Sequence, residues 1–77
     1  MRKQDIVKNR LSDILFLVSW GDVSREYFGE SGSWLYHKLD GVDKNNEPFA
    51  FTDEERQKLK DALVDLSSRI RQAAEKL

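Results

Sequence analysis

Apolar residues recur at helical spacing over residues 4 to about 18, with charged residues between them. This period predicts a first amphipathic helix. Positions 14–18 are apolar on every side, so we expect the end of this helix to be the most deeply buried part of the fold. The apolar positions of the helix are Ile6, Val7, Leu11, Ile14, Leu15 and Val18.

The stretch at about residues 19–41 predicts two short helices joined by a tight turn. Ser19 and Ser31 occupy expected N-cap positions, where a serine hydroxyl accepts a hydrogen bond from a free amide of the first turn. Gly29 and Gly41 occupy the expected helix ends, because glycine adopts the left-handed conformation without a Cβ clash. Two helices at this spacing are typical of a helix-turn-helix motif.

A loop at about residues 41–51 follows the two central helices. Its polar Asp-Lys-Asn-Asn run is a turn signal, and Pro48 bars a helix. Val42 before this turn can pair with Phe49 and Phe51 after it in a very short hairpin. Alternatively, the two aromatic rings fold back onto the helices, and the sequence leaves both arrangements open.

The last segment predicts a long helix over about residues 53–76. Thr52 and Glu55 have the spacing of a capping box, in which each side chain bonds the other residue's amide. Apolar residues then repeat at alternating spacings of four and three, which is a heptad-type seam. The seam either packs inside the domain or forms a dimer strip. Its members are Leu59, Leu63, Leu66, Ile70, Ala73 and Leu77.

Together these patterns predict an all-α fold of about four helices in one domain, residues 1–77, with a helix-turn-helix at its centre. A chain of this length has a small core. It contains no cysteine, which excludes disulfides, thiol catalysis and thiolate metal sites. The core must therefore come from helix packing, from a partner subunit, or from both.

The charge and the hydropathy of the chain limit the classes of protein to which it can belong. Thirteen cations against fourteen anions give a net charge of −1, so the strongly basic balance of many nucleic-acid-binding domains is absent. The longest apolar run, Ile14 to Val18, is far shorter than the roughly twenty residues of a membrane span. The N-terminal residues lack the pattern of a signal peptide. We therefore expect a cytoplasmic protein that does not associate with membranes.

The second helix of the motif carries the candidate binding residues. If this helix enters a DNA major groove, the side chains near its N-terminus face the bases and phosphates. The stretch from Ser19 to Gly41 is nevertheless acidic, with two cations against four anions. The candidate DNA-binding residues are Arg25, Ser31, Ser33, Trp34, Tyr36, His37 and Lys38. Further positive charge is available from Arg2, Lys3, Lys8, Arg10, Arg56, Lys58 and Lys60.

An interaction with a protein is the second hypothesis for the same face. Trp20 and Phe28 are expected in the core, because a small domain needs their large apolar area. Trp34 and Tyr36 cannot both point inward from one short helix, so at least one should be exposed. An exposed aromatic ring suits a protein-binding hot spot, and the partner can be a second copy held through the C-terminal helix.

Catalysis and cofactor binding are not expected. His37 is the only histidine and has no acid and nucleophile at suitable spacing. No His and carboxylate positions have metal-ligand spacing. The four glycines are isolated and lack the lysine of a phosphate-binding loop.

The motif S-W-L-Y-x-K-L-x-G followed by F-T-x-E-E resembles a family of small bacterial proteins, partly phage- or mobile-element-associated, known only as a domain of unknown function. The resemblance covers residues 14–77 and implies an intracellular, all-helical protein without an assigned activity.

A weaker likeness is to helix-turn-helix domains of the phage-repressor type. In that comparison Val23-Ser24 corresponds to a Leu-Ala pair, Gly29 to the turn glycine, Ser31 to the capping serine and Gly41 to the closing glycine. The spacing between Ser24 and Gly29 departs from the repressor pattern by one residue, and the second helix lacks glutamine and arginine base readers. This likeness implies DNA binding through the second helix of the pair.

Overall fold

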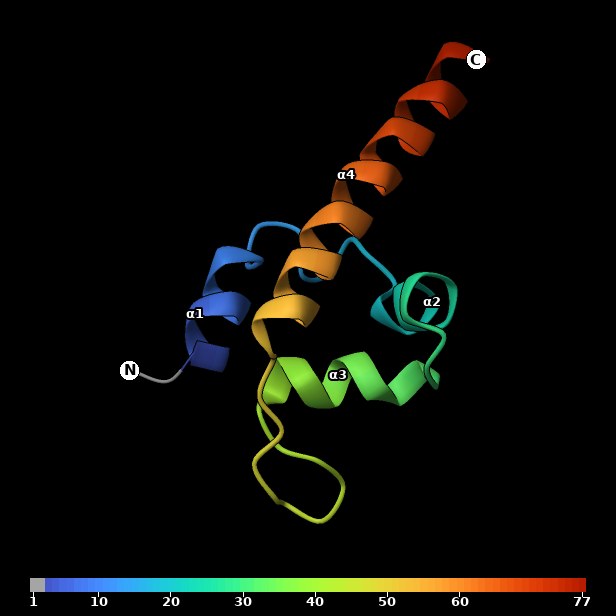
Figure 1. The fold of residues 1–77 in the computed structure, drawn as a ribbon. Helices are drawn as coiled ribbons and strands as arrows, with labels where there is room; N and C mark the ends of the chain where they lie inside the picture. Colours follow the sequence, from blue (N-terminus) through green and yellow to red (C-terminus); the bar gives the residue numbers. More distant parts are fainter. Residues whose placement is uncertain (1–2) are drawn as a thin grey trace.

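The computed structural model describes residues 3–77, and the side chains of residues 7–77. Arg2 lies outside the described residues, as does the side chain of Lys3. The prediction of an all-α fold is confirmed, since four α-helices and one π-helical segment make up the architecture over residues 3–77 (Figure 1). These elements are α1 (Lys3–Arg10), α2 (Trp20–Val23), η1 (Ser24–Phe28), α3 (Gly32–Asp40) and α4 (Asp53–Glu75).

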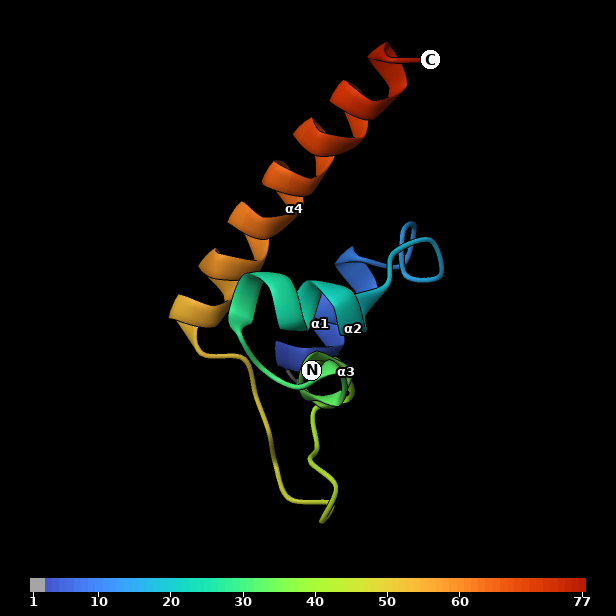
Figure 2. The same cartoon turned by 90° about the vertical axis from the view of Figure 1, so that its right-hand side faces the viewer.

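The first helices form a small body, and α4 runs along it and then projects beyond it (Figures 1 and 2). At 1.5 Å per residue the 23 residues of α4 span about 35 Å. The Cα trace accordingly extends 44 Å in its longest direction but only 25 and 22 Å in the other two. The last turns of α4, after Ile70, therefore project beyond the body, and their side chains are exposed.

The core lies where α1, α2, α3 and the first half of α4 meet. Trp20 and Leu35 are its most deeply buried large side chains, with 2% and 0% of their surface exposed. The sequence predicted both Trp20 and Phe28 in the core. Trp20 is buried there, whereas Phe28 is only half buried and packs against the core from its edge. The buried apolar cluster consists of Val7, Trp20, Val23, Leu35, Leu39, Phe51 and Leu59.

The central helix pair has the predicted ends. The Ser19 hydroxyl accepts a hydrogen bond from the Asp22 amide. Gly29 and Gly41 both adopt left-handed conformations, with φ of 65° and 84°. Ser31 occupies the N-cap position of α3, but its hydroxyl makes no capping hydrogen bond and lies 3.4 Å from that of Ser33. The bend at Gly29 is therefore confirmed.

The segment before this bend is a π-helix rather than a continuous α-helix. Ser24 at its start is fully buried, and its hydroxyl donates to the Ser31 carbonyl at 2.6 Å. The carbonyl of Ser24 accepts from the amides of Gly29 and Glu30. The hydroxyl and the carbonyl of Ser24 therefore both bond to the turn at residues 29–31. These bonds satisfy polar groups of Ser24 that burial would otherwise leave unpaired.

The prediction of a first helix reaching residue 18 is wrong. Helix α1 ends at Arg10, and residues 11–17 form consecutive turns. In these turns the amides of Ser12, Ile14, Leu15 and Leu17 bond carbonyls three residues back. The carbonyl of Leu15, which an α-helix would offer to Ser19, instead accepts from the Trp20 indole at 2.9 Å. The chain therefore curls to place Trp20 in the core.

The expected burial of positions 14–18 is also wrong. Ile14, Leu15 and Val18 pack against the core, but Phe16 and Leu17 are 96% and 82% exposed. A body this small cannot enclose a segment that is apolar on every side.

The loop between α3 and α4 is a minimal hairpin. Val42 and Pro48 form an isolated antiparallel bridge, and the carboxylate of Asp43 accepts from the amides of Asn45 and Glu47. Phe51 then turns inward and is 4% exposed.

Helix α4 starts as predicted. The hydroxyl of Thr52 accepts from the Glu55 amide at 3.1 Å, and the Glu55 carboxylate accepts from the Thr52 amide at 2.9 Å. The heptad-type seam is divided along the helix. Leu59 is buried, Leu63 and Leu66 are half buried against the body, and the later members are exposed.

Candidate interaction surfaces

The seven predicted binding residues lie on or beside α3, but they do not form one exposed face. Ser31, Ser33 and Tyr36 are exposed, with Tyr36 at 46%. Trp34 and His37 are half buried, Arg25 is exposed at the start of α3, and Lys38 is buried. The prediction that at least one of Trp34 and Tyr36 is exposed is confirmed by Tyr36.

The outward orientation predicted for Lys38 is wrong. Its side chain is buried, and its ammonium lies 2.9 Å from the Glu55 carboxylate and donates to the Ala50 carbonyl at 2.9 Å. The ammonium also lies over the ring of Phe49, 4.0 Å from its centroid. Position 38 falls on the inner face of α3 with Leu35 and Leu39, so the lysine joins α3 to α4 instead of facing a partner.

The Lys38 pair favours the charged form of the Glu55 carboxyl. Partial burial would raise the pKa of Glu55, but hydrogen bonds from the Lys38 ammonium and the Thr52 amide outweigh it and lower the pKa below its ordinary value. The Glu55 carboxylate is therefore held in its charged form, 2.9 Å from the Lys38 ammonium. Lys38 is the only lysine or arginine of α3, so the helix offers no cation for a phosphate.

Arg25 is the other predicted cation, and it lies at the start of α3. A Cβ added to Gly32 would overlap its guanidinium, which shows how closely the arginine covers the first turn. The same guanidinium is bound to the carboxylate of Asp22, one turn earlier in the chain. Its charge is thereby balanced locally, and this ion pair lowers the pKa of Asp22.

The half-buried Trp34 is held by its aromatic neighbours. Its ring lies 5.1 Å from that of Phe28 and 6.2 Å, edge-on, from that of Phe49. This cluster, with the Lys38 ammonium 5.3 Å from the Trp34 ring, fixes the hairpin loop against α3. Trp34 is therefore a packing residue in this conformation rather than a free hot spot.

A polar network links η1 to α4. The Tyr27 hydroxyl donates to the Asp65 carboxylate at 2.7 Å and accepts from the Arg69 guanidinium at 3.0 Å. Arg69 also pairs with Glu26. The hydrogen bond to Asp65 is the largest influence on Tyr27 and raises the pKa of its hydroxyl.

An apolar patch lies beside this network. It consists of Phe16, Leu17, Val18, Leu66 and Ile70, and none of these side chains is buried. Leu17, Val18, Leu66 and Ile70 line one hollow of about 310 Å³. Val18 also lines a neighbouring hollow with Phe16, so the two parts of the patch are continuous.

The charged residues at the rim of the 310 Å³ hollow are paired with one another or with a neighbour. Asp22 is bound to Arg25, and Glu26 is bound to Arg69. The hollow therefore combines an apolar lining with a rim whose charges are balanced.

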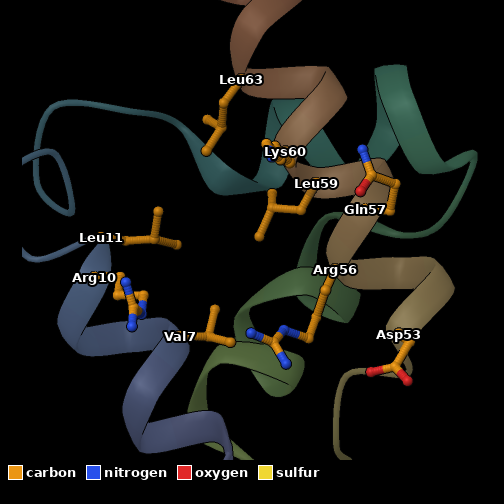
Figure 3. A pocket seen from close by; sticks show the side chains of 9 residues that line it. All are labelled: Val7, Arg10, Leu11, Asp53, Arg56, Gln57, Leu59, Lys60 and Leu63. Carbon is orange, nitrogen blue, oxygen red and sulfur yellow. The ribbon is translucent and has the colours of Figure 1, made fainter.

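A second surface lies between α1 and α4, in a groove of about 450 Å³ (Figure 3). We name it the cationic groove, because three cations and one carboxylate line it. Figure 3 shows Arg10 on α1 and Arg56 on α4 on opposite sides of it. The groove is lined by Val7, Arg10, Leu11, Asp53, Arg56, Gln57, Leu59, Lys60 and Leu63.

Neither surface was predicted from the sequence as a site. Arg10, Arg56 and Lys60 were noted only as scattered sources of positive charge, and the fold brings them to one groove. The signal for the patch was the apolar run at positions 14–18, which exceeds what one helix face can bury. Its adjacency to Ile70 depends on the direction of α4 and has no local signal.

Over residues 7–77 no three histidine or carboxylate side chains come together as metal ligands would. No helix within residues 3–77 is both long and apolar enough to cross a bilayer.

The comparisons with known proteins give one result. A family model described as "Domain of unknown function (DUF5053)" matches residues 7–77. No curated protein and no solved structure matched the chain.

Proposed function

The chain belongs to the DUF5053 family, whose description assigns no activity, and we propose from its surface that it is a non-catalytic protein-interaction domain that self-associates through the apolar patch. The observation that carries this proposal is the exposure of Phe16 and Leu17, at 96% and 82%, next to a hollow lined by Leu66 and Ile70. Contiguous exposed apolar side chains mark interaction sites in soluble proteins.

A second copy of the chain is the occupant that the charges favour. A two-fold interface places the same patch on both subunits, so the patch must complement itself. The charges around the apolar patch allow two copies to meet without repulsion, because Glu26 is balanced by Arg69 and Asp22 by Arg25. Its apolar parts can also cover each other, because Phe16 and Leu17 project beside the hollow that Leu66 and Ile70 line.

The second half of α4 extends the same interface. Ile70 is 60% exposed and Leu77 is fully exposed, although both continue the seam that Leu59 begins inside the core. An apolar helix face without a neighbour gains free energy when a second helix covers it. The seam is therefore intramolecular in its first half and available to a partner in its second half.

Sedimentation of matched variants tests the proposal. Ile70→Gln and Leu17→Gln should weaken self-association at least tenfold, because each removes a side chain that becomes buried in both subunits. Val64→Gln is the matched control, since Val64 is 61% exposed on the same helix and lines neither hollow of the patch. It should leave the association unchanged.

Two outcomes would contradict self-association through this patch. One is a protein that stays monomeric at the highest soluble concentration. The other is equal weakening by Val64→Gln and Ile70→Gln, which would indicate nonspecific association of an apolar helix. Circular dichroism of each variant establishes that its helices remain formed.

DNA binding through α3 stays a prediction from the sequence. Its one favourable observation is the position of the Arg25 guanidinium over Gly32, the residue between Ser31 and Ser33. Pairing with Asp22 reduces the charge of Arg25 available to a phosphate. A gel shift at low salt and at about 200 mM salt tests it, because phosphate binding loses affinity steeply over this range.

A further inference from the structure

We propose that the cationic groove is a second binding site, which takes an acidic amphipathic helix of a partner protein. The site lies between α1 and α4 and is distinct in its residues from the apolar patch. This inference does not rest on self-association, and its test below uses a separate ligand.

The floor of the groove has the spacing of a helix-packing surface. Val7 lies on α1, and Leu11, the first residue after α1, bonds through its amide to the Val7 carbonyl at 3.2 Å. Leu59 and Leu63 lie one turn apart on α4. Val7 and Leu59 are buried, whereas Leu11 and Leu63 are only half buried and keep apolar surface in the groove. Two such rows leave a trough in which the ridge of a third helix can pack.

Among the side chains of residues 7–77, the rim of the groove carries an excess of positive charge. Arg10, Arg56 and Lys60 face a single carboxylate, Asp53, in a chain whose net charge is −1. The ion pairs formed among residues 7–77 all lie elsewhere in the structure. Asp53 is the first residue of α4, where its carboxylate interacts favourably with the helix dipole.

Apolar floor and cationic rim together define the chemistry of the occupant. A complementary helix presents leucine-type residues toward the floor and carboxylates on both flanks toward the cations. The rim charge also disfavours a second copy of the same groove as its partner, because like charges would meet. In this respect the groove differs from the apolar patch, whose rim charges are balanced.

Fluorescence polarisation with designed peptides tests this site. The probe is a labelled helical peptide with leucines at positions i, i+3, i+4 and i+7 and glutamates flanking them. The matched probe replaces every glutamate with lysine. The full chain should bind the acidic peptide at least tenfold more tightly than the basic one. The difference should shrink as ionic strength rises, because salt screens exposed charges.

Charge-reversal variants locate the binding. Arg56→Glu and Lys60→Glu should each weaken binding of the acidic peptide about tenfold, and the double variant more. Arg71→Glu makes the same charge change on an exposed position of α4 outside the groove and should have little effect. Leu63→Gln should weaken binding of the acidic peptide at least fivefold, because Leu63 supplies apolar surface to the floor of the groove.

Three results would overturn the proposal. The first is no binding of the acidic peptide by the folded chain at millimolar peptide. The second is an equal loss for Arg71→Glu and Arg56→Glu. The third is binding of a DNA duplex that Arg56→Glu abolishes while the peptide does not bind, which would make the groove a phosphate site. Ile70→Gln should leave the affinity for the acidic peptide unchanged, so a failure of this site and a failure of self-association are measured separately.

Discussion

The ammonium of Lys38 and the carboxylate of Glu55 meet at 2.9 Å and join α3 to the first turn of α4. The side chain of Lys38 is 7% exposed, and that of Glu55 is 25% exposed. Glu55 also completes the capping box of α4 with Thr52. One carboxylate therefore both starts the long helix and attaches it to the body.

Removing the lysine should destabilise the fold. We expect Lys38→Met to lower the free energy of unfolding by about 2 kcal/mol, less than for a fully buried pair because water reaches Glu55. Lys44→Met, the same change at an exposed loop position, should stay within about 0.5 kcal/mol of the wild type. Urea denaturation followed by circular dichroism gives both values. Equal stability of Lys38→Met and wild type would contradict the structural role of the pair.

The pair also gives stability a dependence on pH. Because the folded-state pKa of Glu55 is lowered, its contribution is fully present above the ordinary glutamate pKa of about 4.3. As pH falls through that value toward the folded-state pKa, the unfolded chain binds the proton first and stability is lost. Glu55→Gln should flatten this part of the profile, whereas Glu75→Gln should not. Denaturation midpoints measured from pH 7 to pH 3 check this.

Local signals in the sequence predicted the ends of the later helices. Ser19, Gly29, Gly41 and the Thr52 capping box act through hydrogen bonds or backbone angles within a few residues. Such interactions are present in the sequence itself, and this is why the central bend and the start of α4 were predictable.

The residues that were mispredicted depend on distant contacts. The chain leaves the α-helical conformation after Arg10, and the Leu15 carbonyl accepts from the indole of Trp20, whose ring is buried in the core. The hydrophobic period predicted a helix that continues to about residue 18. It does not show how much apolar surface the rest of the small domain can cover.

In the candidate site, the position of Lys38 also depends on a distant contact. Its spacing from Leu35 places it on the inner face of α3, a signal that the sequence does contain. Its partner Glu55 is seventeen positions away, across a loop whose course the sequence left open. A charged side chain was therefore expected outside, where charged residues without a partner are found.

Tyr27 provides a spectroscopic test of the network that joins η1 to α4. Its pKa is raised chiefly by the hydrogen bond that it donates to Asp65, so Asp65→Asn should shift its titration to lower pH. The absorbance of tyrosinate measures this in a Tyr36→Phe background, where Tyr27 is the only tyrosine. A titration unchanged by Asp65→Asn would show that the hydrogen bond is absent in solution.

Gly29 should be sensitive to substitution for a backbone reason alone. A Cβ at this position would meet no atom within 4 Å, but the φ of 65° disfavours any residue with a side chain. We expect Gly29→Ala to cost about 1 kcal/mol and Gly29→Asn to cost less, because asparagine tolerates this conformation better. Thermal unfolding of the two variants measures the difference. A larger loss for asparagine than for alanine would indicate steric crowding instead.

Substitution of Phe16 distinguishes a side chain that stabilises the core from one that contributes to an interface. Since the ring is 96% exposed, Phe16→Ser should change the free energy of unfolding of the monomer by no more than about 0.5 kcal/mol. Leu35→Ala, at a fully buried position, should cost about 3 kcal/mol. Denaturation at a concentration where the chain is monomeric makes the comparison. The same Phe16→Ser substitution should weaken the proposed self-association, because in that assembly a second copy covers the ring. A large loss of monomer stability for Phe16→Ser would instead place the ring in the core and remove the basis for the patch.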